Sequence, residues 1–179
     1  MQKKGDVWIS AILYFGIGIV IITILLTAGL PVINKLRDKN IIIQTKQVMH
    51  TMDDNIREVI KEGTGSQRVV TVNIKKGTIN VNEDSDEIIW TFQGANIPIS
   101  EPDIEVAEGK IFIITREGAE GGKYDVSIIL KYGNEKVDIT KGTGDAGSVT
   151  GIGDLVIRNN GVSPEDEEKM QVVVSQSNA

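Results

Sequence analysis

An uncharged and strongly apolar run near the N-terminus constrains this chain more than any other feature. It extends from Val7 to Ile33, which is 27 positions (33 − 7 + 1) without Asp, Glu, Lys or Arg. A helix needs about 20 apolar residues to cross the hydrocarbon core of a bilayer. Because every backbone N–H and C=O inside a bilayer must find a partner within the protein, we expect the run to be helical.

Three interpretations of this run are open. It is a membrane anchor, or a secretory signal that is discarded, or a retained helix from which only the leader MQKKG is removed. The discarded signal fits least well, because the apolar core of a signal peptide spans only about 7–15 residues. Lysine and arginine flank the two ends of the run in nearly equal number, so the positive-inside rule gives no orientation.

Small residues interrupt the run at Gly16, Gly18 and Gly29, and Pro31 stands near its end. Small residues let helices approach closely in lipid, so we predict that these four positions shape helix–helix packing. The alternative is that glycine is simply common in membrane helices. Because proline lacks an N–H and clashes with the preceding turn, the sequence also predicts a kink or a loosened turn over residues 28–31.

The helical pattern continues beyond the run, over residues 34–62. An apolar stripe recurs there at spacings of three and four residues, namely at Met49, Met52, Ile56 and Val59. The C-terminal domain can cover part of this stripe, and a stripe on a stalk also indicates neighbouring copies of the chain. The glycines in EGTGSQ predict the end of the helix and a domain boundary over residues 63–67.

After this boundary the sequence becomes rich in β-branched residues. Segments that read as short strands are 68–74, 77–83, 86–93, 110–117, 124–133, 135–140, 148–159 and 169–176. Turn-forming residues separate them, and Pro98 and Pro102 mark an irregular loop or sheet edge. The sequence therefore predicts an α+β fold, with a long N-terminal transmembrane or filament-core helix followed by an antiparallel β-sandwich-like domain over residues 66–179.

The composition argues against several function classes. A net charge of −6 disfavours a nucleic-acid partner, because binding phosphates requires a basic surface. Cysteine is absent, and the one histidine, His50, is expected to be a surface or packing residue. No nucleophile with a matching base stands out over residues 66–179, so we expect neither enzymatic activity nor a cofactor or metal.

Two local motifs are better interpreted as turns. GTGDAG at 142–147 matches the dinucleotide-binding pattern G-x-G-x-x-G, but a strand-like segment follows it where that site needs a helix. NEDSDE at 82–87 gathers carboxylates of the kind that bind calcium, but it lacks the spacing and the glycine of an EF-hand loop. We predict a solvated hairpin turn there.

The N-terminal third resembles archaeal type IV pilins, within the wider pilin and archaellin superfamily. The resemblance is carried by MQKKG, the uncharged run directly after it, the long continuing helix and the β-rich remainder. It implies a leader at 1–5, a hydrophobic transmembrane or filament-core helix at 6–33, an amphipathic continuation at 34–62 and a β-rich globular domain at 66–179. A prepilin peptidase would cleave between Gly5 and Asp6 and remove the leader charges Lys3 and Lys4.

The resemblance also implies partners and a location. The precursor would be inserted in the membrane, and the mature chain would assemble with copies of itself into an extracellular filament, with the help of pilus assembly machinery. Surface attachment is the expected role.

One departure concerns the fifth mature position, where bacterial members usually carry glutamate and this chain has Ser10. Asp6 is acidic, and we hypothesise that it pairs with an N-terminal amine in the filament core.

Two alternatives to the major subunit remain open. One is a non-polymerising, single-span, membrane-anchored extracellular binding domain, and the other is a minor pilin.

Overall fold

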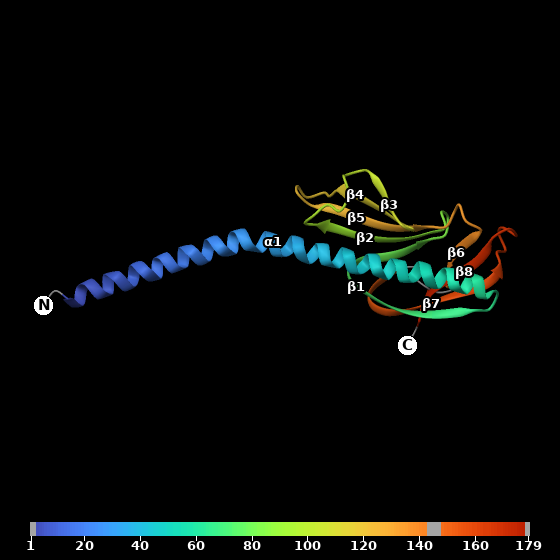
Figure 1. Ribbon diagram of the computed structural model, residues 1–179, viewed down its shortest axis with the longest axis horizontal. Helices are drawn as coiled ribbons and strands as arrows, with labels where there is room; N and C mark the ends of the chain where they lie inside the picture. Colours follow the sequence, from blue (N-terminus) through green and yellow to red (C-terminus); the bar gives the residue numbers. More distant parts are fainter. Residues whose placement is uncertain (1–2, 143–147, 178–179) are drawn as a thin grey trace. The chain divides into compact units, whose positions relative to one another are not determined.

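The computed structural model describes residues 3–142 and 148–177, and in these ranges it contains one helix followed by eight strands (Figure 1). The chain divides into two compact units, of which the first ends at Arg37 and the second begins at Asp38. The second unit contains the remainder of the helix together with all the strands. The predicted α+β class, with a long N-terminal helix and a mostly antiparallel β-domain, is confirmed.

Helix α1 extends from Lys3 to Glu62. Pro31 lies inside it, and the helix continues through this residue, so the turn over 28–31 is not broken. At the other end Gly63 has a φ of 93°, a left-handed conformation that ends a helix and that glycine adopts readily. The helix therefore ends where the glycines of EGTGSQ predict.

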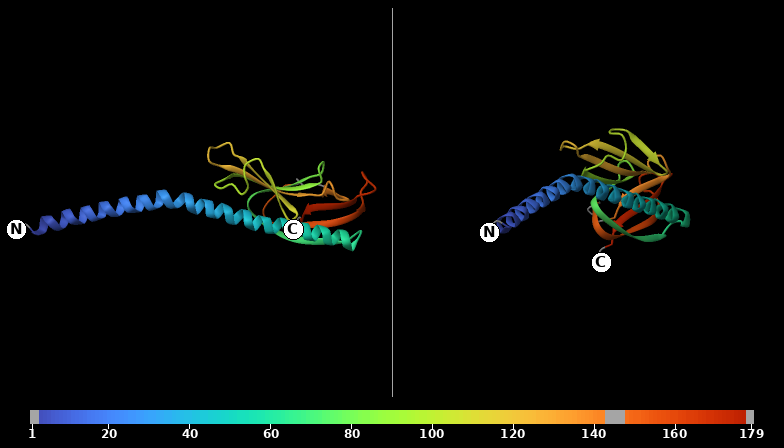
Figure 2. Two further views of the ribbon diagram at one scale, coloured as in Figure 1. Left: turned by 45° about the horizontal axis from the view of Figure 1, so that its top comes forward. Right: turned by 60° about the vertical axis from the view of Figure 1, so that its left-hand side comes forward.

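The strands form one hydrogen-bonded sheet in the order β3-β4-β5-β2-β1-β7-β8-β6. The strands are β1 (Gln67–Asn82), β2 (Glu87–Ala95), β3 (Glu105–Glu108), β4 (Ile111–Glu117), β5 (Tyr124–Lys131), β6 (Val137–Lys141), β7 (Ser148–Val162) and β8 (Met170–Gln176). Neighbouring strands are antiparallel except β6 and β8, which are parallel. The sheet is strongly curled (Figures 1 and 2).

Two of the strand predictions are wrong. Segments 68–74 and 77–83 are one strand, β1, and the KKG sequence between them forms a bulge and not a turn, with a register shift between Ile74 and Ile79. The bulge needs Gly77, because its φ is 80° and a Cβ there would lie 2.4 Å from the carbonyl oxygen of Thr91. Strand β3 was not predicted, since all four of its residues are exposed and show no alternation.

The core of the second unit lies between one face of the sheet and one face of α1. The largest buried side chains include Trp90 and Tyr132. The helical stripe of Met49, Met52, Ile56 and Val59 is fully buried there, at 0% exposure. Because the chain's own sheet covers this stripe, the stripe itself gives no evidence for neighbouring copies, and self-assembly stays a prediction.

Candidate functional site

The first unit carries a continuous apolar surface around the whole circumference of α1. No residue from Trp8 to Arg37 is buried. The large exposed apolar side chains are Trp8, Ile9, Ile12, Leu13, Tyr14, Phe15, Ile17, Ile19, Val20, Ile21, Ile22, Ile24, Leu25, Leu26, Leu30, Val32, Ile33 and Leu36. The helix is long and apolar enough to cross a membrane, which fits a transmembrane or a signal helix. In water such a surface would be unfavourable, so it needs lipid or protein around it.

Two polar side chains in this run form hydrogen bonds within the helix. The hydroxyl of Thr23 donates to the carbonyl oxygen of Ile19, and that of Thr27 donates to the carbonyl oxygen of Thr23, both at 2.8 Å. This i−4 bonding is common for threonine in helices. It removes the cost of placing an unpaired hydroxyl in a hydrocarbon environment.

The predicted packing glycines lie on two opposite faces of α1. At about 100° of rotation per residue, Gly16 and Gly18 point about 160° apart, whereas Gly18 and Gly29 lie within about 20° of each other. Thr23 and Thr27 fall on the Gly16 face, and Pro31 lies nearer to that face than to the other. A Cβ added at Gly16, Gly18 or Gly29 would meet nothing within 4 Å. Packing within this chain therefore does not explain the three glycines.

The predicted processing site lies at the start of α1. The backbone of Lys3, Lys4, Gly5 and Asp6 is helical, and their side chains lie outside the described part of the structure. The proposed pairing of Asp6 therefore stays a prediction.

A buried carboxylate, Asp38, begins the second unit. Its Oδ1 accepts a hydrogen bond from Lys76 Nζ at 3.0 Å, and its Oδ2 accepts one from the backbone N–H of Asn96 at 2.9 Å. Burial by itself raises the pKa of Asp38, but the hydrogen bonds from Asn96 and Lys76 outweigh it and hold the pKa below its ordinary value. The sequence analysis did not single out Asp38.

A second polar network joins α1 to the end of β5. The hydroxyl of Tyr132 donates to Asp53 Oδ1 at 2.8 Å, and Arg57 Nε donates to Asp53 Oδ2 at 2.9 Å. Two further nitrogens of Arg57 bind the carboxylate of Glu135 at 3.0 and 3.1 Å. Burial, together with the neighbouring Asp53 carboxylate, raises the pKa of the Tyr132 hydroxyl well above its ordinary value. These groups bond one another across the contact between α1 and the segment after β5, so they link the helix to the sheet.

The NEDSDE segment forms the turn between β1 and β2, as predicted, but the turn is not wholly solvated. Asp86 is buried, at 6% exposure, and has a positive φ of 53°. Glu83 and Asp86 accept backbone hydrogen bonds from β6, so these oxygens are already engaged. Among the described residues, no group of three or more His, Asp or Glu side chains could hold a metal ion.

The other predicted features are found as follows. His50 is half-buried, with its ring beside Gly109. In the GTGDAG motif Gly142 follows β6, whereas residues 143–147 lie outside the described residues. The segment after the motif is strand β7, so the helix that a dinucleotide site requires is not there.

We compared the chain with protein-family models, curated proteins and solved structures, and no match was found in any of the three. The candidate functional site is therefore defined by the apolar surface of α1 from Trp8 to Leu36, together with the leader that precedes it.

Proposed function

We propose that this chain is the structural subunit of a type IV pilus-like filament on the cell surface. The observation that carries the proposal is the apolar surface around all sides of α1 from Trp8 to Leu36, with small residues on two opposite faces. One close-packing face is enough for a dimer. Two opposite faces let each helix contact a neighbour on either side, which permits open-ended assembly.

The sequence before this surface supports a processing step. Lys3 and Lys4 add two positive charges next to the apolar run, and charged side chains are costly to move into an apolar environment. Cleavage after Gly5 by a prepilin peptidase removes them and lowers the cost of moving the helix from lipid into a filament. The precursor is then a membrane protein, and the mature chain is extracellular, where its β-domain supports surface attachment.

One observation favours a second function, that of a membrane-anchored domain that does not polymerise. The apolar stripe on the second half of α1 is covered by the chain's own sheet, so the β-domain needs no neighbour to complete its core. Lipid alone would then cover the first half of the helix. A minor subunit of a filament lies between these two functions.

Mass spectrometry of the N-terminal peptide from the native protein tests the proposal first. A mature chain that begins at Asp6 and keeps the apolar run is expected, with Gly5→Val remaining uncleaved. Electron microscopy of cells that carry the wild type or Gly5→Val then tests filament formation, which we expect only for the wild type. A native chain that still begins at Met1 contradicts the processing step. A processed chain without filaments favours the anchored domain.

A further inference from the structure

The two edges of the sheet are formed by β6 and β3, and the edge at β6 is blocked. Within the part of the chain that the structure describes, β6 pairs only with β8. Because successive N–H groups of a strand point to opposite sides, the amides of Ile139 and Lys141 face away from β8. Such a row of free donors is a template on which another chain can add a strand.

Two carboxylates occupy these donors. Asp86 Oδ1 accepts the N–H of Ile139 at 3.0 Å, and Glu83 Oε1 accepts the N–H of Lys141 at 2.8 Å. Both carboxylates belong to the turn between β1 and β2, residues 83–86. Side chains of this turn therefore take the positions that the carbonyl oxygens of an added strand would take.

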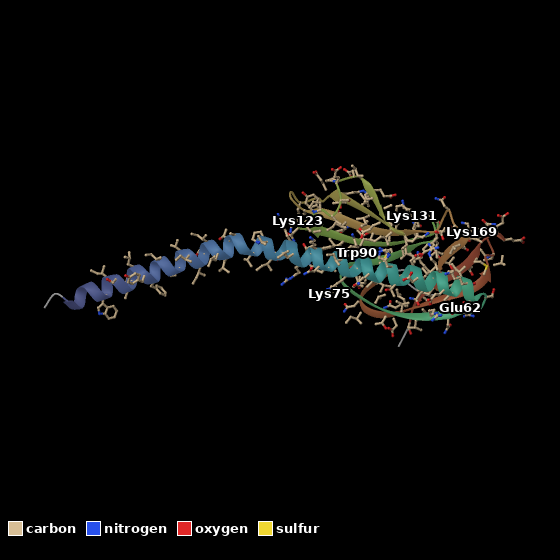
Figure 3. The ribbon with its side chains drawn as sticks, in the orientation of Figure 1. Glu62, Lys75, Trp90, Lys123, Lys131 and Lys169 are labelled. Carbon is tan, nitrogen blue, oxygen red and sulfur yellow. The ribbon has the colours of Figure 1, made fainter. Side chains whose placement is uncertain are left out.

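Further contacts hold this turn in place. Lys169 Nζ, from the residue before β8 (labelled in Figure 3), lies 2.7 Å from Asp86 Oδ2. The carbonyl oxygen of Asp86 accepts the N–H of Tyr132 at 2.9 Å. A Cβ at Gly133 would lie 3.0 Å from the carbonyl oxygen of Ser85, so glycine is what lets the turn approach this closely. Contacts with the residue before β8 and with the loop after β5 therefore hold the turn in place.

The opposite edge of the sheet is open. In the described residues β3 pairs only with β4, and all four residues of β3 are exposed. Its acidic side chains are paired, Glu105 with Lys131 and Glu108 with Lys46. These ion pairs lower the repulsion that would otherwise keep a second chain away from β3.

We propose that the turn at residues 83–86 is an autoinhibitory clasp that closes the β6 edge to strand addition. When the clasp is displaced, the β6 edge of one copy accepts the β3 edge of a second copy. Because this contact joins two different surfaces, it repeats from copy to copy and builds open-ended chains of sheets. The inference concerns the β-domain alone and does not depend on how the N-terminal helix assembles.

The test compares the full chain in detergent micelles with the double variant Glu83→Ala/Asp86→Ala, which removes both acceptors, and with the control Asp84→Ala. Asp84 lies in the same turn, and among the described residues its side chain forms no hydrogen bond or ion pair with β6. In the double variant we expect amide hydrogen exchange at Ile139 and Lys141 to accelerate at least about tenfold. Thr140, whose N–H faces β8, keeps its protection. Light scattering over a concentration series should show association of the double variant only.

A rescue variant separates strand addition from general unfolding. Val106→Lys places a charge on the exposed edge strand β3, which disfavours strand pairing. Added to the double variant, it should restore the wild-type association state while the exchange at Ile139 stays fast. If the double variant loses its circular dichroism, Glu83→Ala alone is used, with faster exchange expected at Lys141. The proposal is overturned by unchanged exchange, by fast exchange without association, or by association that Val106→Lys leaves intact.

Discussion

Asp38 of α1 and Lys76 of the β1 bulge form a part-buried contact across 38 positions of sequence, with Oδ1 and Nζ 3.0 Å apart. Asp38 is only 1% exposed, and the amide of Asn96 donates to its other oxygen. The side-chain oxygen of Asn96 in turn accepts a hydrogen bond from Lys123 Nζ at 2.7 Å. One carboxylate therefore ties the helix to the bulge and to the loop after β2.

Asp38→Ala is expected to lower the free energy of unfolding of the β-domain by about 2–3 kcal/mol, because the N–H of Asn96 loses its acceptor in a buried site. Chemical unfolding can be followed by the fluorescence of the buried Trp90 in a Trp8→Phe background, where it is the sole tryptophan. Asp54→Ala, an exposed position on the same helix, is the control and should change the free energy by less than about 0.5 kcal/mol. Equal losses in the two variants would contradict the role of Asp38.

The lowered pKa of Asp38 predicts a loss of stability in acid. Since its pKa is lower in the folded than in the unfolded state, the folded state favours the ionised form. The contribution is fully present above the ordinary pKa and is lost as the pH falls through that value toward the folded one. Unfolding curves of the wild type should therefore weaken more steeply between about pH 5 and pH 3 than those of Asp38→Asn. Parallel pH profiles would show that Asp38 does not set this dependence.

The helical part of this fold could be predicted because its signals are local. The helix α1 is predicted by the uncharged run and by the apolar stripe at helical spacing. Its end is predicted by the glycines that follow. The exposed strand β3 and the bulge in β1 could not be predicted, because both depend on partners far away in sequence. The bulge exists where the indole N–H of Trp90 donates to the carbonyl oxygen of Lys76 at 3.0 Å, and a KKG sequence alone reads as a turn.

The sequence analysis also did not predict the polar contacts of the β-domain, although the sequence contains one signal for them. Asp38 lies four residues before Ile42, on the side of the helix that carries the buried stripe, so a charge there predicts a buried partner. The lysine that pairs with it comes from a different strand. Nothing local in the sequence identifies Lys76, and for the same reason Tyr132 could not be matched to Asp53.

Gly77→Ala is expected to destabilise the β-domain by about 2–4 kcal/mol, since it adds a clash to an unfavourable φ. The new Cβ would lie 2.4 Å from the carbonyl oxygen of Thr91 and 2.7 Å from the indole nitrogen of Trp90. Gly151→Ala is a matched control, because Gly151 has a similar φ of 76° but open space around it. It should cost only about 1 kcal/mol. If thermal unfolding gives the two variants equal midpoints, the crowding at Gly77 is unimportant.

Tyr132→Phe is expected to lower the free energy of unfolding by about 1–2 kcal/mol, because the buried carboxylate of Asp53 loses a hydrogen bond. The loss is limited by Arg57, which still pairs with Asp53. Tyr124→Phe is the control, since Tyr124 is only half-buried and its hydroxyl has no hydrogen-bond partner in the described structure. Denaturant unfolding of both variants checks the prediction, and a larger loss for Tyr124→Phe would refute it.

Gly18→Ile and Gly16→Ile, made separately, test whether both faces of α1 are needed for assembly. Each change adds bulk to one of two opposite faces, and neither meets another group within the chain. Folding and membrane insertion should therefore be unchanged, whereas filament formation should be lost in both variants, because each removes one of two close helix contacts. Ile24→Phe adds bulk between the two faces, about 80° from Gly16, and should leave filaments intact. Electron microscopy of cells with equal amounts of each variant makes the comparison. Filaments that survive either glycine substitution would show that close helix packing on that face is not needed for assembly.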